Sequence, residues 1–152
     1  MRKIWYGIKN IIAWFPIIWR DRDWDYVYIY EILGFKLKRT EQNIRKYGHA
    51  MESEAIADQI REVSTALERL IEDDYCADLH SAIHKKWGEM EFADSDKEGY
   101  SVFKFANVNT DEDRVAHAAD ITACMKEEEE AIQKDLALVF DTMRDNIRGW
   151  WD

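Results

Sequence analysis

Two histidines stand at a spacing that suits metal binding. His80 and His84 are four residues apart, so on a helix they share one face and can chelate one ion. Two ligands do not make a site, and zinc proteases carry Glu directly after the first histidine, where this chain has Ser81. The simpler interpretation is a half-exposed helix face. A third ligand would have to come from Asp73, Asp74, Asp78 or His117.

Two acidic runs, at residues 72–74 and 127–130, invite comparison with helical nucleotide pyrophosphohydrolases, which bind Mg²⁺ through paired acids on two helices. The second run supplies the Glu-x-x-Glu motif of those enzymes. The Glu-x-x-Asp motif that should follow it downstream is missing, because the acids there, Asp141 and Asp145, are four residues apart instead of three. Nucleophile elbows and phosphate-binding glycine loops are also absent. The sequence leans against an enzyme and predicts no cofactor, with a metal-dependent nucleotide hydrolase as the alternative.

The densest group of aromatic and charged side chains lies in residues 14–25, called the junction below. A tryptophan there can stack on a base while an arginine binds a phosphate. A simpler interpretation needs no ligand: Asp21, Asp23 or Asp25 caps the next helix beside local ion pairs. The candidate residues for binding a ligand or partner are Trp14, Trp19, Arg20, Arg22, Asp23 and Trp24.

The elements that must position these residues are helices. Apolar residues recur every three or four positions over most of the chain, and a single proline and six glycines interrupt it. Pro16 should bend or stop the first helix near Phe15, and Gly48 should end the second in a left-handed conformation. Helices are predicted over residues 1–15, 24–47 and 51–74, over a shorter stretch ending at Gly88, and from Thr110 to the C-terminus.

These elements predict an all-α fold, a helical bundle of three long helices plus short N-terminal and middle helices, in a single domain of residues 1–152. Residues 100–108 are rich in β-branched and aromatic side chains, which favour a short β-hairpin or an ordered loop. Tryptophans cluster near both chain ends, so we expect the C-terminal pair, Trp150 and Trp151, to pack near the junction.

Charge is unevenly distributed along the chain. The net charge is −10, yet residues 1–48 hold ten Lys/Arg against five Asp/Glu. The overall acidity argues against general nucleic-acid binding, whereas the basic first third suits a small anionic ligand or an acidic partner. The N-terminal apolar run is too short to span a bilayer. An interfacial membrane helix is a less favoured alternative, supported by Trp5, Trp14 and Trp19 with nearby lysines.

The junction motif, Trp14-Phe-Pro-Ile-Ile-Trp-Arg-Asp-Arg-Asp-Trp-Asp25, resembles that of a group of small bacteriophage proteins of uncharacterised function. The resemblance implies a protein made in the cytoplasm of an infected bacterium, and it supplies no activity. It covers most of the chain outside residues 88–125. The other similar segments are Phe35-Lys-Leu37, His49, Ile60-Arg61, Leu70-Ile-Glu72, Tyr75 and Asn146-Ile-Arg-Gly-Trp-Trp-Asp152.

The leading functional hypothesis is a small non-enzymatic binding protein. It would bind a host or phage protein, acting on a host or defence component, or sequester a small anionic, nucleotide-like ligand. Besides the hydrolase, a virion or scaffold component is the alternative, which the long C-terminal helix favours. Heptad-like stripes on two helices also permit a homodimer.

Overall fold

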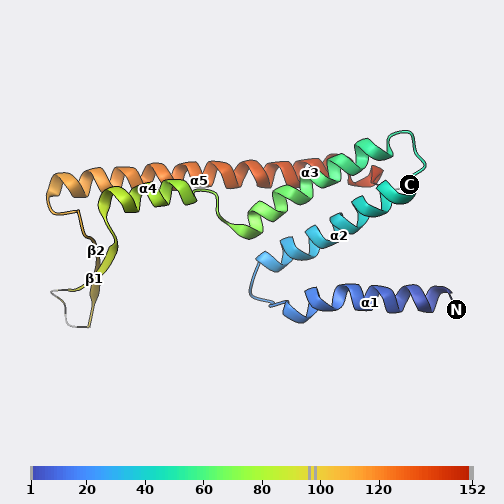
Figure 1. The fold of residues 1–152 in the computed structure, drawn as a ribbon, viewed down its shortest axis with the longest axis horizontal. Coiled ribbons are helices and arrows are strands. Elements are labelled where there is room, and N and C mark those ends of the chain that lie inside the picture. The colour runs from blue at the N-terminus through green and yellow to red at the C-terminus, as the bar shows by residue number, and fades with distance from the viewer. Residues whose placement is uncertain (1, 96, 98, 151–152) are drawn as a thin grey trace. The chain divides into compact units, whose positions relative to one another are not determined.

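The computed structural model describes residues 2–95, 97 and 99–150 and confirms the all-α fold with one short hairpin (Figure 1). The helices are α1 (Arg2–Arg20), α2 (Val27–Tyr47), α3 (Ser53–Glu72), α4 (Ala77–Trp87) and α5 (Asp111–Asn146), which leads into the 3₁₀ turn η1 (Ile147–Gly149). The strands are β1 (Met90–Asp94) and β2 (Ser101–Phe105).

The chain divides into two compact units. Unit 1 comprises Met1–Asp73 and Asp135–Asp152, and unit 2 comprises Asp74–Lys134. The sequence had suggested a single domain over residues 1–152. Each unit is described by itself below.

The core of unit 1 forms where α2 and α3 pack side by side as an antiparallel pair (Figure 1). Gly34 is buried where α2 passes α3, and a Cβ there would lie 3.9 Å from Leu67. Ile60, Val63 and Leu67 recur at helical spacing on α3 and are fully buried. The apolar stripe read from the sequence is therefore the face that forms the core.

Two local predictions about helix ends in unit 1 were wrong in part. Pro16 was expected to bend or stop the first helix near Phe15, but Pro16 lies inside α1, which does not stop there and continues to Arg20. Pro16 and Ile12 are both exposed, so water can hydrate the Ile12 carbonyl that the missing proline N–H leaves unpaired. Gly48 does end α2, but its backbone is extended, with φ −63°. Close approach requires glycine there instead, since a Cβ would lie 2.5 Å from the Ile44 carbonyl oxygen.

The C-terminal tryptophan Trp150 lies elsewhere than beside the junction, where we expected it. Trp150 is buried, and its Nε1 donates a hydrogen bond to Gln59 Oε1 at 2.8 Å. The α3 residues that line a hollow together with Ile17 and Arg20 of the junction are Ser64, Leu67, Glu68 and Ile71. They lie about 7.5–18 Å beyond Gln59 along the helix axis, so Trp150 contacts α3 nearer its start than the junction residues do. Trp151 lies outside the described residues.

Unit 2 holds a smaller core and a hairpin, of which β2 lies in the predicted stretch 100–108 and β1 lies before it. The core is built from Cys76, Ile83, Trp87 and Cys124, with Phe105 packed against it. Strands β1 and β2 are antiparallel, with Phe92 opposite Phe103. At the start of α5, the Asp113 N–H donates to Thr110 Oγ1 at 3.0 Å and the Thr110 N–H to Asp113 Oδ2 at 2.8 Å. This reciprocal cap is the helix start that the sequence predicted.

None of the helices in the described residues combines the length and apolar character needed to cross a lipid bilayer.

Candidate functional site

The structure separates the three junction tryptophans. Trp14 is half-buried, and its ring lies edge-on to Phe35 with the centroids 4.7 Å apart. Trp19 is 72% exposed and lies against Phe15, and Trp24 is 82% exposed. The three rings therefore do not form one aromatic pocket.

The junction arginines contact nearby backbone. Arg22 Nη1 donates hydrogen bonds to the carbonyls of Asp21, at 2.7 Å, and Arg20, at 3.2 Å. Arg20 Nε donates to the Pro16 carbonyl at 3.3 Å, and its Nη2 lies 3.7 Å from Glu31. These contacts fit a structural role.

The loop between α1 and α2 has an unsuitable charge for an anion. Asp23 and Trp24 line a hollow of about 310 Å³ that also contains Asp21 and Asp25, so acids outnumber the single Arg22. The Val27 N–H donates to the Asp25 carboxylate at 3.0 Å, as the helix-cap interpretation requires.

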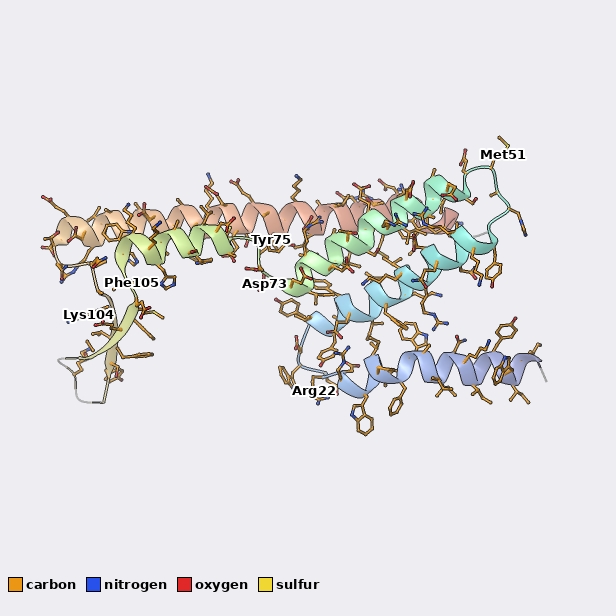
Figure 2. The ribbon with its side chains drawn as sticks, viewed as in Figure 1. Arg22, Met51, Asp73, Tyr75, Lys104 and Phe105 are labelled. Carbon is orange, nitrogen blue, oxygen red and sulfur yellow. The ribbon has the colours of Figure 1, made fainter. Side chains whose placement is uncertain are left out.

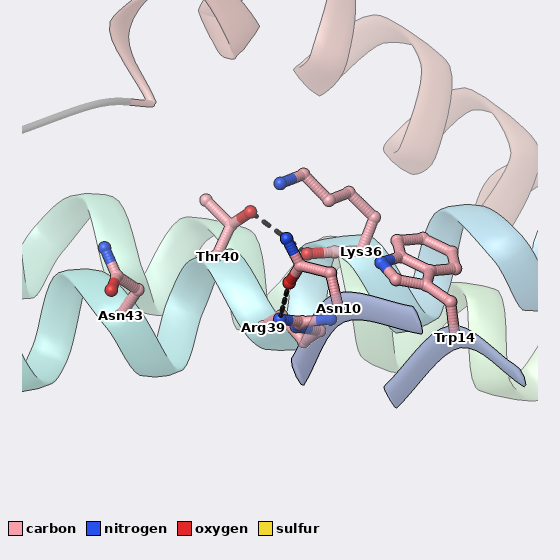
Figure 3. Close-up of a pocket in the computed structure, with 6 residues that line it drawn as sticks. All are labelled: Asn10, Trp14, Lys36, Arg39, Thr40 and Asn43. Carbon is pink, nitrogen blue, oxygen red and sulfur yellow. Dashed lines mark hydrogen bonds between the residues drawn. The ribbon is translucent and has the colours of Figure 1, made fainter. Parts of the chain in front are cut away.

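A different hollow, between α1 and α2, carries the chemistry expected of an anion site. It has a volume of about 350 Å³, within the range of small-molecule sites, and none of the described residues that line it is an acid (Figure 3). We call it the Arg39 pocket. Its lining residues are Asn10 and Trp14 from α1 and Lys36, Arg39, Thr40 and Asn43 from α2.

Arg39 is the central group of this pocket. Its Nη2 donates a hydrogen bond to Asn10 Oδ1 at 2.9 Å, and its guanidinium carbon lies 5.7 Å from the centre of the Phe35 ring. Its Nη1 is buried and has no hydrogen-bond partner among the described residues. A buried N–H without an acceptor is costly, and a guanidinium binds a phosphate or carboxylate through two such groups. Arg39 therefore brings a guanidinium to the lining of a pocket that also contains Trp14.

Of the six junction candidates, only Trp14 belongs to the Arg39 pocket. Our sequence reasoning missed the other five lining residues, although a signal was present. Three of them follow Lys36 by three, four and seven residues, and this helical spacing places all four on one face of α2. These three are Arg39, Thr40 and Asn43. Their meeting with Asn10 and Trp14 depends on how α1 crosses α2, which no local pattern specifies.

The histidines lie in unit 2 and are both exposed. His80 Nε2 is 3.8 Å from Cys124 Sγ and 4.0 Å from Glu128, while the His84 ring lies 5.9 Å from that of Phe105. Within the described part of the chain, no group of three or more His, Cys, Asp or Glu is placed to hold a metal. A metal site there remains a prediction without a third ligand.

No family model, curated protein or solved structure matches the chain. The Arg39 pocket is therefore interpreted from its own residues.

Proposed function

We propose that the protein is a non-enzymatic binding protein that holds a small anionic, nucleotide-like ligand in the Arg39 pocket. The observation that carries the proposal is Arg39, a cation in a pocket whose described lining contains no acid, and whose buried Nη1 has no hydrogen-bond acceptor among the described residues. Lys36 adds a second positive charge to the lining. A phosphate would supply the acceptor oxygens and the negative charge.

The aromatic side of the pocket indicates what the rest of the ligand is. Trp14 is half-buried and lines the pocket, with Phe35 holding its ring edge-on. An aromatic ring beside a cation suits a base joined to a phosphate. Asn10, Thr40 and Asn43 add neutral amide and hydroxyl groups for further hydrogen bonds.

The resemblance to bacteriophage proteins supports a setting for this activity. In that setting the protein would sequester its ligand in the cytoplasm of an infected bacterium, or present it to a host or defence component.

The test is calorimetric titration of the purified protein with AMP, GMP, inorganic phosphate and adenosine. We expect the nucleotides to bind and adenosine, which lacks the phosphate, to bind weakly. The Arg39→Gln variant should lose about tenfold to a hundredfold in nucleotide affinity, because a charge-assisted hydrogen bond contributes roughly 1.5–3 kcal/mol.

Lys46→Gln is the matched control, since Lys46 is an exposed cation on α2 outside the pocket, lying over the Tyr47 ring. It should bind nucleotide like the unaltered protein. Absence of saturable binding for all phosphate-bearing probes, or equal losses in both variants, would contradict the proposal.

A further inference from the structure

Helix α1 has two faces of different character. Its side toward α2 carries Asn10, Trp14 and Ile17, which line the hollows between the helices. Its other side is a continuous apolar surface, called the α1 apolar face. At about 100° per residue, its eight members cover an arc of about 140°. They are Ile4, Trp5, Ile8, Ile11, Ile12, Phe15, Ile18 and Trp19.

This apolar face is exposed to solvent. Figure 2 shows side chains projecting from the side of α1 turned away from α2. Ile4 and Ile11 are each 69% exposed, Ile12 is 68% exposed and Trp19 is 72% exposed. Soluble monomers rarely leave an apolar surface of this kind in water, because its burial is favourable.

The charge around the α1 apolar face indicates which kind of surface would bind it. The first 20 residues contain four Lys/Arg and no Asp/Glu, in a chain that has 31 acids. Lys3 and Lys9 are exposed, and the Lys9 ammonium lies 5.1 Å from the centre of the Trp5 ring. Arg20 is also exposed. A cationic helix with an isoleucine and tryptophan face has the chemistry of helices that lie in the plane of an anionic lipid surface.

A second copy of this chain would fit the face less well. Two α1 helices packed through their apolar faces would bring like charges together, since α1 carries no acid to pair with them. Anionic headgroups, in contrast, are spread over a plane and can meet cations on both flanks of the helix at once. We propose that α1 docks, through its apolar face, on an anionic lipid bilayer and lies in its interface.

This inference is independent of the proposed ligand, because Asn10, Trp14 and the α2 residues of the Arg39 pocket lie outside the apolar face. Experiments can therefore reject ligand binding in the Arg39 pocket and lipid binding by the α1 apolar face separately.

The test is co-sedimentation of the full chain with unilamellar vesicles of phosphatidylcholine mixed with phosphatidylglycerol, compared with phosphatidylcholine alone. We expect binding to the anionic vesicles that weakens as salt is added. An Ile4→Ser/Ile11→Ser double variant should bind at least about tenfold more weakly, since it removes apolar contact with the acyl chains.

The matched control is Ile29→Ser, because Ile29 is a 64% exposed isoleucine on α2. It should bind vesicles like the unaltered protein, and circular dichroism should show that all variants keep their helix content. Lys3→Gln/Lys9→Gln should abolish the preference for anionic vesicles.

Three outcomes would overturn the proposal. The first is an unaltered protein that stays in the supernatant with both kinds of vesicle. The second is vesicle binding that is equal in the Ile4/Ile11 and Ile29 variants. The third is a dimer in analytical ultracentrifugation that the Ile4/Ile11 variant loses, without vesicle binding, which would assign the face to a second copy instead.

Discussion

Arg39 and Arg45 lie on the same helix and meet opposite surroundings. Arg45 bonds three carboxylates, with Nη1 at 3.0 Å from Glu54, Nη2 at 2.6 Å from Asp58, and Nε on Glu41. In the described part of the structure, the hydrogen bond of Arg39 goes to a neutral amide oxygen, that of Asn10. Arg45 therefore joins α2 to α3, whereas no ion pair of Arg39 with a carboxylate is found among the described residues.

The Arg45 cluster predicts a pH-dependent stability. Its hydrogen bonds hold the pKa of Glu41 and of Asp58 below their ordinary values. Because both carboxyls have lower pKa values folded than unfolded, their contribution is complete above the unfolded values, near pH 4, and is lost as pH falls through the folded values. Urea unfolding should therefore show that Arg45→Gln reduces the free energy of unfolding at neutral pH and has a smaller effect at about pH 3.

Arg148→Gln is the control for that measurement, because it removes the same charge from an exposed position of η1. Its effect should be small and should change little with pH. If Arg45→Gln lowers stability equally at both pH values, the cluster does not supply the pH dependence.

At the scale of elements, each helix end depends on contacts among a few residues. The start of α5 offers a direct test. Thr110 and Asp113 satisfy each other's backbone N–H at the start of α5, and the hydrogen bonds from Thr110 lower the pKa of Asp113. Thr110→Ala removes the hydroxyl that accepts the Asp113 N–H, so we expect thermal or urea unfolding to show a loss of about 1 kcal/mol.

The comparison for the cap is Ser81→Ala, which removes an exposed hydroxyl from the interior of α4 in the same unit. Alanine is the better helix former, so this variant should be neutral or slightly more stable. Equal losses in the two variants would mean that the cap is not a source of stability.

Helix α1 is the element whose role the sequence described least well. Its proline predicted a bend or a stop near Phe15, and the helix does not stop there but continues to Arg20. Its strongest apolar stripe is also not the face that contacts α2. The 3.6-residue period shows that such a stripe exists, but it does not specify whether this protein, a partner or a lipid covers it.

At the scale of the whole molecule, stability depends on a small core. In unit 1 the fully buried large side chains are Ile60, Val63, Leu67 and Val139. Leu67→Ala should lower the free energy of unfolding by about 2–5 kcal/mol, because it removes buried methyl groups and leaves a cavity. Met51, labelled in Figure 2, is fully exposed, so Met51→Ala should change stability little. Urea unfolding of both variants decides whether the α2–α3 contact forms the core.

Most of the fold could be predicted from the sequence because its signals are local. The helix predicted over residues 51–74 from its apolar spacing is α3, whose stripe of Ile60, Val63 and Leu67 is the core face, and the helix predicted to begin at Thr110 begins there with a reciprocal cap. The candidate site was predicted only in part. Trp14 lines the Arg39 pocket, whereas the emphasis on Arg20 and Arg22 followed their nearness to tryptophans in sequence.

The sequence by itself determined the helical fold, the place of the second hairpin strand and the basic character of the first third. Backbone hydrogen bonds, helix caps and apolar periodicity act within a few residues of each other. Only the tertiary structure decided that Arg39 meets Asn10 rather than an acid, that the junction tryptophans separate, and that the α1 apolar face is left exposed. Those outcomes depend on which face of one helix packs on another, and that choice is made by contacts between residues far apart in the chain.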